Sequence, residues 1–118
     1  MDLIDKRVVL TGGASGIGAA VLRRLANAGA RCVHVADQNQ VALSALISEL
    51  PPQCNIQGAT LDVTDREALT NWFNGADAAM GGIDIVINNA GINKIAPFAE
   101  VSISDFQAIQ QVNLVAPF

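Results

Sequence analysis

The sequence has no tyrosine, and its aromatic residues are limited to one tryptophan and four phenylalanines in 118 residues. A buried core must therefore be built from aliphatic side chains. Hydrophobic residues make up 51% of the sequence and charged residues 15%, which excludes a disordered chain. An aliphatic core of this kind is typical of a parallel sheet that helices cover on both faces.

Basic residues are also few. Seven lysines and arginines stand against eleven acidic residues, the net charge is −4, and the only adjacent basic pairs are Lys6–Arg7 and Arg23–Arg24. This scatter argues against nucleic acid or an anionic membrane as the main partner, because both require clustered positive charge. No apolar run is long enough to span a bilayer, and the N-terminal MDLIDKRVVL does not resemble a signal peptide. We expect a cytoplasmic protein.

Metal-binding residue types are scarce as well. The two cysteines, Cys32 and Cys54, offer neither a metal-ligand spacing nor a disulfide framework. We expect both to be core residues in a reducing compartment. The single histidine, His34, lies within an apolar run, and we assign it no function. No metal site is predicted.

Short apolar runs alternate with helical patterns along the chain. The runs predict four buried strands, at residues 7–10, 31–37, 55–61 and 83–87. Helices are predicted after each strand, beginning near residues 17, 41, 64 and 104 and ending, for the first three, at Gly29, Pro51 and Gly81. Strands joined by helical crossovers run parallel. Right-handed crossovers then predict an α/β doubly wound sheet of strand order 3-2-1-4.

The helical periodicity further predicts caps and buried faces. Thr64 and Glu67 have the spacing of a capping box, and Ser104 and Gln107 could cap the last helix. The positions expected to face the sheet are Ile17, Ala20, Val21, Leu25 and Ala28 in the first helix, Val41, Leu43, Leu46, Ile47 and Leu50 in the second, Ala68, Leu69, Trp72, Phe73, Ala76 and Met80 in the third, and Phe106, Ile109 and Val112 in the last.

A glycine-rich turn joins the first strand to the first helix. From Thr11 to Gly18 it reads TGGASGIG, with the spacing G-x-x-x-G-x-G. Glycine lets the backbone approach a pyrophosphate closely, and the start of the helix offers free N–H groups and a positive dipole to that anion. The alternative is that the glycines only close the turn. The residues predicted to bind a dinucleotide here are Thr11, Gly12, Ser15, Gly16, Ile17 and Gly18.

Asp37 stands at the end of the second strand, nineteen residues after Gly18. An acidic side chain at this place accepts hydrogen bonds from the adenosine ribose of NAD. The same carboxylate would repel the 2′-phosphate of NADP, and no Lys or Arg lies between Thr11 and Gly18 to attract it. A solvated loop aspartate is the alternative. The position favours NAD.

Two further motifs follow the third and fourth strands. Asp62 and Val63 are expected at the adenine, where the Asp62 carboxylate can accept a hydrogen bond from the amino group. Asn89, with the backbone of Ala90 and Gly91, can line the ribose. Each motif alone could be an ordinary cap or strand-end turn. All four motifs fall on strand ends, and ligands of doubly wound sheets bind there.

Together these motifs resemble those of the short-chain dehydrogenase/reductase family. Its T-G-x-x-x-G-I-G, strand-2 Asp, D-V and N-N-A-G motifs are all matched in order. The resemblance covers the whole chain and implies a single Rossmann domain over residues 1–118. It implies an NAD-dependent oxidoreductase that moves a hydride between NAD(H) and an alcohol or carbonyl substrate, and that forms a homo-oligomer when complete. It also implies that Asn113 is the family's structural Asn, which helps hold a proton-relay water.

The resemblance does not extend to the catalytic Ser and Tyr-x-x-x-Lys residues, since the chain has no tyrosine and its only lysines are Lys6 and Lys94. We expect a truncated NAD(P)-binding domain, inactive alone, that stops at Phe118 before a fifth strand. An open edge at residues 83–87 would leave it marginally stable. If 118 residues is the natural length, the alternative is a non-catalytic NAD-binding or interaction module. A methyltransferase that binds S-adenosylmethionine is a third reading, which the Asn-Asn-Ala-Gly run disfavours.

Overall fold

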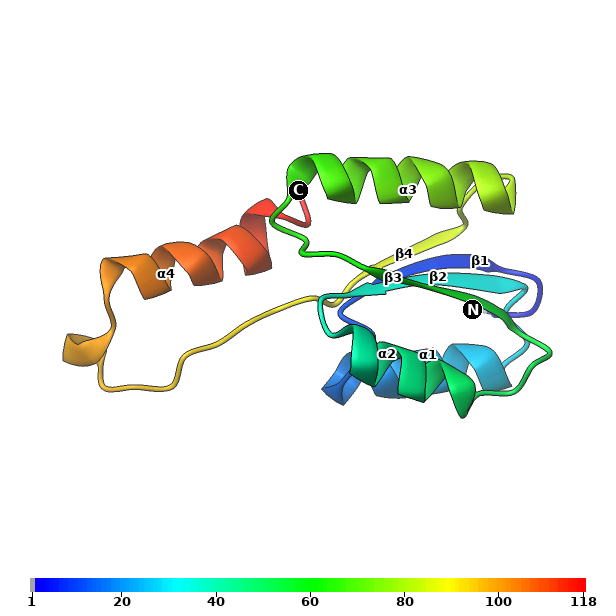
Figure 1. Ribbon diagram of the computed structural model, residues 1–118, viewed down its shortest axis with the longest axis horizontal. Coiled ribbons are helices and arrows are strands. Elements are labelled where there is room, and N and C mark those ends of the chain that lie inside the picture. The colour runs from blue at the N-terminus through cyan, green and yellow to red at the C-terminus, as the bar shows by residue number, and fades with distance from the viewer. Residues whose placement is uncertain (1) are drawn as a thin grey trace.

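A computed structural model describes residues 2–118. It contains one parallel sheet of four strands in the order β3-β2-β1-β4 (Figure 1). The strands are β1 (Arg7–Thr11), β2 (Cys32–Asp37), β3 (Asn55–Thr60) and β4 (Ile85–Asn88). In the centre of the sheet, Val9 pairs with His34 of β2 and Val86 of β4. The predicted strand order is confirmed.

Helices cover the two faces of the sheet unequally. Helices α1 (Gly16–Asn27) and α2 (Gln40–Ser48) lie on one face, and α3 (Arg66–Met80) lies on the other (Figure 1). This division follows from right-handed crossovers, because the connection from β3 to β4 runs opposite to the first two. None of the helices in residues 2–118 has the length and apolar character needed to cross a membrane.

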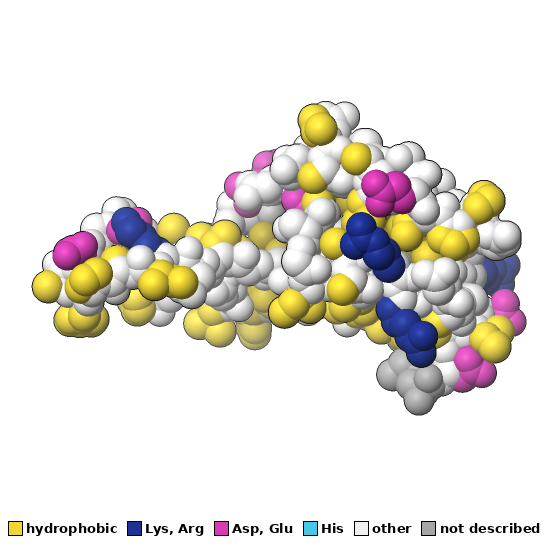
Figure 2. Space-filling model, turned by 90° about the horizontal axis from the view of Figure 1, so that it is seen from below, with side chains coloured by type: hydrophobic (Ala, Val, Ile, Leu, Met, Phe, Trp, Pro, Cys, Tyr) yellow, Lys and Arg dark blue, Asp and Glu magenta, His cyan; other side chains and the backbone are white. Residues whose placement is uncertain are grey.

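The final part of the chain extends away from the sheet. After β4 the backbone passes through a 3-10 turn at Phe98–Glu100 into α4 (Ile103–Gln110) and one π-helical turn at Gln111–Val115. We call residues 92–115 the arm (Figure 1). Hydrophobic side chains gather along it (Figure 2). The large exposed ones are Ile92, Ile95, Phe98, Ile103, Phe106, Leu114 and Val115.

The core lies between the sheet and the α1–α2 layer. Val8, Leu10, Val33 and Val35 are fully buried strand residues of this core. Their helical partners include Leu22 of α1. On the other face, the only fully buried residue of α3 is Ala76. The side of the sheet that positions the glycine turn is therefore the better packed one.

The predicted buried face of α1 is wrong in part. Leu25 is buried, but Ile17 is 77% exposed and Ala20 is exposed, while Gly18, Ala19, Leu22 and Ala26 face inward. The helix is rotated because Gly18 packs directly against Gly12. A Cβ atom on Gly18 would overlap the Gly12 carbonyl oxygen. Ile17 lies about 100° further round the helix and is turned out.

Helix α2 shows a similar deviation. Leu43 and Leu46 are buried, and Ile47 packs against the core as predicted, but Val41 is exposed. Val41 precedes Leu43 by two positions, which puts it about 200° away around the helix. In α3, all six positions predicted to face the sheet are at least half-buried.

Both predicted helix caps are wrong. Asp65, not Thr64, caps α3, and its carboxylate accepts a hydrogen bond from the Ala68 N–H at 3.0 Å. The cap of α4 is Ser102, which forms a capping box with Asp105. Because α4 lies in the arm rather than on the sheet, Phe106 is 53% exposed, whereas Ile109 and Val112 are half-buried.

The fourth strand begins two residues later than predicted. The Asp84 carboxylate accepts the Arg7 N–H at 2.9 Å, in place of a backbone carbonyl of the neighbouring strand. Gly81 ends α3 in the left-handed conformation, with φ of 70°. The predicted helix stop at Gly81 is confirmed, and the side-chain contact of Asp84 explains the shorter strand.

Candidate functional site

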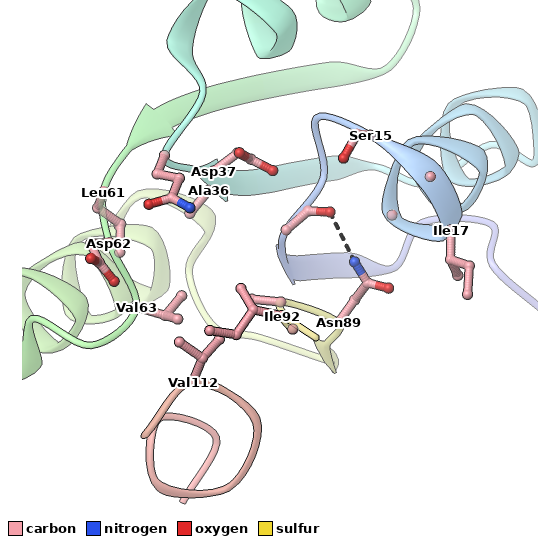
Figure 3. Close-up of a pocket in the computed structure, with 16 residues that line it drawn as sticks. Ser15, Ile17, Ala36, Asp37, Leu61, Asp62, Val63, Asn89, Ile92 and Val112 are labelled. Carbon is pink, nitrogen blue, oxygen red and sulfur yellow. Dashed lines mark hydrogen bonds between the residues drawn. The ribbon is translucent and has the colours of Figure 1, made fainter. Parts of the chain in front are cut away.

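The carboxyl ends of the four strands border a cleft of about 520 Å³ (Figure 3). Eleven of the twelve residues predicted to bind the cofactor line it, and the exception is Thr11. Five further residues line the cleft without having been predicted from the sequence, namely Ala36, Gln38, Leu61, Ile92 and Val112. Ala36, Gln38 and Leu61 are chain neighbours of Asp37 and Asp62, so their strand-end positions could have indicated them. Nothing in the sequence pattern places Val112 of the arm here.

The glycine turn is held to the end of β2 by its first amides. The N–H groups of Gly12 and Gly13 both donate to the Ala36 carbonyl oxygen, at 2.8 and 3.4 Å. Gly12 has φ of +71°, and a Cβ atom there would lie 2.8 Å from the Ala90 Cα. Glycine is therefore required at this position by both backbone conformation and space.

The four amides that follow Ala14 are free. Within residues 2–118, the N–H groups of Ser15, Gly16, Ile17 and Gly18 donate to no protein acceptor. They are the unpaired amides at the start of α1, where the helix dipole is positive. A Cβ atom on Gly16 would meet no atom within 4 Å, so the space beside it is open. This arrangement suits an anion such as a pyrophosphate.

Asp37 lies beside these amides, at the point where the glycine turn meets the end of β2. Its Oδ2 accepts the Ala14 N–H at 2.9 Å, and its Oδ1 accepts the Asn39 N–H at 2.9 Å. The side chain is partly buried and lines the cleft. Each carboxylate oxygen can accept a second hydrogen bond, so ribose hydroxyls can be added to the backbone contacts.

Thr11 and Asn89 join the turn to the end of β4. The buried Thr11 hydroxyl accepts the N–H groups of Asn89 and Ala90, both at 3.2 Å. The Asn89 side-chain amide donates to the Gly12 carbonyl oxygen at 2.8 Å (Figure 3) and to the Thr11 carbonyl oxygen at 3.2 Å. Thr11 thus shapes the cleft from beneath without lining it, and Asn89 does both.

Asp62 makes local contacts, whereas Asn113 binds a residue at the other end of the arm. The Asp62 carboxylate accepts hydrogen bonds from the Thr64 N–H and hydroxyl, at 2.9 and 2.8 Å, and lines the cleft with Val63. The Asn113 side chain, in the π-helical turn, accepts the Ile92 N–H at 2.8 Å and donates to the Ile92 carbonyl oxygen at 2.9 Å. Asn113 itself does not line the cleft.

The lining of the cleft carries negative charge only. Asp37 and Asp62 line it, and among residues 2–118 no Lys, Arg or His does. The largest pKa shifts belong to two residues that do not line the cleft, Asp84 and Asp105. Hydrogen bonds from Arg7 hold the pKa of Asp84 well below its usual range, and Lys94, 2.6 Å from Asp105, lowers the pKa of Asp105 to about 2 together with Ser102.

Three further titratable groups lie in or beside the core, namely the buried Cys32 and Cys54 and the half-buried His34. Burial lowers the pKa of His34 and raises those of Cys32 and Cys54. None of the three lines the cleft. Among the described residues, no three His, Cys, Asp or Glu side chains lie close enough to hold a metal ion.

Comparison with known proteins identifies the family. A family model described as short chain dehydrogenase matches residues 6–118. The 3beta-hydroxysteroid dehydrogenase 2 of Eggerthella lenta is 37% identical over 95% of this chain, and the D-threitol dehydrogenase of Mycolicibacterium smegmatis is 36% identical over 98%. The chain spans 44% and 45% of the lengths of these relatives.

Solved structures agree. A dehydrogenase/reductase from Sinorhizobium meliloti 1021 matches with a TM-score of 0.90 and 36% identity, covering 99% of this chain and 47% of that protein. A 3-ketoacyl-(acyl-carrier-protein) reductase from Brucella melitensis, complexed with NADH, matches with a TM-score of 0.86 and 26% identity, covering 98% of this chain and 46% of that one. With its sheet order, its glycine turn and these matches, the chain belongs to the short-chain dehydrogenase family.

Proposed function

We propose that this chain is the dinucleotide-binding part of an NAD-dependent oxidoreductase that acts on an alcohol or carbonyl substrate. The observation that carries the proposal is that four free amides at the start of α1 and the Asp37 carboxylate line the same cleft. The amides suit a pyrophosphate, and the carboxylate suits the ribose hydroxyls.

The residues present fit the cofactor. The N–H groups from Ser15 to Gly18 would bind the pyrophosphate, and the Cβ-free surface of Gly12 and Gly18 lets the turn pack closely under it. Asp62 and Val63 would border the adenine. Asn89, Ala90 and Gly91 would line the second ribose, and Asn113 would act through its hold on Ile92. When bound, the nicotinamide ring supplies the hydride acceptor or donor.

Preference for NAD over NADP rests on charge. The Asp37 carboxylate would face the 2′-phosphate of NADP, and the lining residues of the cleft supply no cation to balance it. The NADH complex of the Brucella melitensis reductase shows that a structural relative binds the same cofactor. Residues 1–118 contain no tyrosine, so we expect them to bind the cofactor without oxidising an alcohol.

A pair of titrations tests the proposal. NADH and NADPH are titrated into the chain, and binding is followed by cofactor fluorescence. We expect NADH to bind at least about tenfold more tightly, because an unpaired like charge at the ribose costs more than about 1.4 kcal/mol. Tighter binding of NADPH would show that the NAD assignment is wrong, and absence of binding by either would refute the dinucleotide site.

The substrate, homo-oligomeric assembly and cytoplasmic location stay predictions, as does the single domain over residues 1–118. A non-catalytic NAD-binding module is the second candidate function, and the absence of tyrosine favours it for the 118 residues taken alone. Substrate-dependent formation of NADH by this chain would exclude that candidate.

A further inference from the structure

The glycine turn is divided into an anchored half and a free half. In the anchored half, Gly12 and Gly13 donate to the Ala36 carbonyl oxygen and Ala14 donates to the Asp37 carboxylate. In the free half, the amides from Ser15 to Gly18 have no acceptor in residues 2–118. The Asp37 contact is the last one before the free half begins.

The three anchoring bonds differ in what they require of the sequence. The first two use the backbone carbonyl of Ala36 near the end of β2, which any residue type at that position would provide. The third requires a side-chain acceptor of the right length, and Asp37 Oδ2 supplies it at 2.9 Å. The other oxygen, Oδ1, is held at 2.9 Å by the N–H of Asn39, the residue that caps α2. The carboxylate is therefore fixed from one side while it holds the turn on the other.

We propose that Asp37 is a positioning residue for the phosphate-binding turn, in addition to its expected contact with the ribose. By accepting the Ala14 N–H, it fixes the point at which the backbone changes from bonded to free amides. Without the Asp37 carboxylate, the Ala14 N–H has no acceptor, and the backbone that carries the four pyrophosphate-binding amides is no longer fixed in position. This inference rests on the proposed function, because it concerns the same site. It differs in predicting an effect on ligands that Asp37 cannot touch.

Hydrogen exchange in the ligand-free chain tests the contact directly. In the unmodified protein, the Ala14 amide should exchange more slowly than the amides of Ser15 and Gly16. In Asp37→Ala its exchange should become about tenfold faster, as expected for loss of one hydrogen bond to a charged acceptor. Asp37→Asn keeps a side-chain oxygen and should restore most of the protection.

Asp62→Ala is the matched control. Asp62 is also a strand-end carboxylate of the same cleft, but it accepts hydrogen bonds only from Thr64. Its removal should leave the Ala14 exchange rate unchanged. If the Asp37→Ala protein does not fold, the unmodified chain still decides the matter. An Ala14 amide that exchanges as fast as that of Ser15 would overturn the proposal.

A cofactor analogue separates positioning from ribose contact. The probe is a reduced dinucleotide whose adenosine ribose carries neither the 2′ nor the 3′ hydroxyl. If Asp37 positions the turn, Asp37→Ala should weaken binding of this analogue by about tenfold, which corresponds to about 1.4 kcal/mol, and Asp37→Asn should recover most of the loss. Weaker NADH binding with unchanged analogue binding would overturn the proposal. If the unmodified chain binds neither NADH nor the analogue, the proposed function is wrong. The hydrogen-exchange rates still test the bond between Ala14 and Asp37 in that case.

Discussion

At the scale of single residues, polar side chains tie both ends of β1 to β4. At the amino end, the Arg7 guanidinium donates to both oxygens of Asp84, from Nε at 2.9 Å and from Nη2 at 2.8 Å. At the carboxyl end, Asn89 donates to Thr11 twice, from its backbone N–H to the Thr11 hydroxyl and from its side-chain amide to the Thr11 carbonyl oxygen. The pairing between them covers only four residues of β4. These contacts therefore help to fix the register on which the cleft depends.

The Arg7–Asp84 pair makes stability depend on pH. The folded-state pKa of Asp84 is lowered, so the pair stabilises the protein fully above the unfolded-state pKa near 3.8 and less as pH falls below it. Asp84→Asn should therefore lower the free energy of unfolding at pH 7, and the difference should shrink below about pH 4. Urea denaturation at several pH values measures it. Glu100→Gln, at a residue with no ion pair among residues 2–118, is the control. A difference that stays constant to pH 3 would contradict the prediction.

Two glycines of the turn should respond differently to substitution. A Cβ atom on Gly16 meets open space, although its φ of +53° disfavours other residues, whereas one on Gly18 would overlap Gly12. Gly16→Val should reduce NADH affinity at least about tenfold by crowding the pyrophosphate, with little change in helical circular dichroism. Gly18→Val should also lower the melting temperature. Unchanged NADH affinity in Gly16→Val would remove the turn from the binding site.

At the scale of elements, periodicity predicted which helices exist better than it predicted their rotation. The existence of α1, α2 and α3 follows from apolar spacing. The rotation of α1 is set by the contact of Gly18 with Gly12. The spacing of apolar residues cannot predict this contact, because both residues are glycines. For α4 the sequence predicts an inward Phe106, which is exposed because the helix lies in the arm rather than on the sheet.

The cap of α3 offers a test at this scale. The Asp65 carboxylate accepts the Ala68 N–H, whereas the Thr64 hydroxyl donates to Asp62 and does not cap the helix. Asp65→Ala should lower the free energy of unfolding by about 1 kcal/mol, the usual cost of losing a helix cap. Urea denaturation measures this, with Thr64→Ala as the comparison. A larger loss in Thr64→Ala would mean that the predicted capping box forms after all.

At the scale of the whole molecule, topology made the site predictable. Parallel strands in the order 3-2-1-4 bring the residues after each strand to one edge, so Asp37, Asp62 and Asn89 could be placed together from the sequence. What could not be predicted was how these residues bond to each other. The Asp37 carboxylate accepts the Ala14 N–H, and the Asn89 side chain donates to the Gly12 carbonyl oxygen. Both hydrogen bonds depend on the exact backbone geometry of the turn.

The outer edge of β4 has no partner strand among residues 2–118. Ile85 and Ile87 pack partly against the core, but Val86 on the α3 face is 46% exposed. We expect the 118-residue chain to be marginally stable and to associate through this edge. Light scattering should show species larger than a monomer, and Val86→Lys should reduce them. Val41→Lys, at an exposed valine of α2, is the control.

A monodisperse monomer of the unmodified chain, with a sharp thermal transition, would contradict this prediction. Equal effects of Val86→Lys and Val41→Lys would also contradict it, since the second substitution changes net charge without touching β4. The comparison separates edge pairing from general solubility.

The arm has a consequence for how the molecule would open. No residue of the arm is buried, and among residues 2–118 one side-chain hydrogen bond, from Arg66 to the Val115 carbonyl oxygen, joins the arm to α3. So few contacts give the arm a low free energy of local unfolding. The arm can therefore unfold locally while the sheet and its three helices stay folded. The cleft would then lose Ile92 and Val112 from its wall and keep the glycine turn and Asp37, so the order of the arm would adjust dinucleotide affinity without removing the pyrophosphate-binding amides.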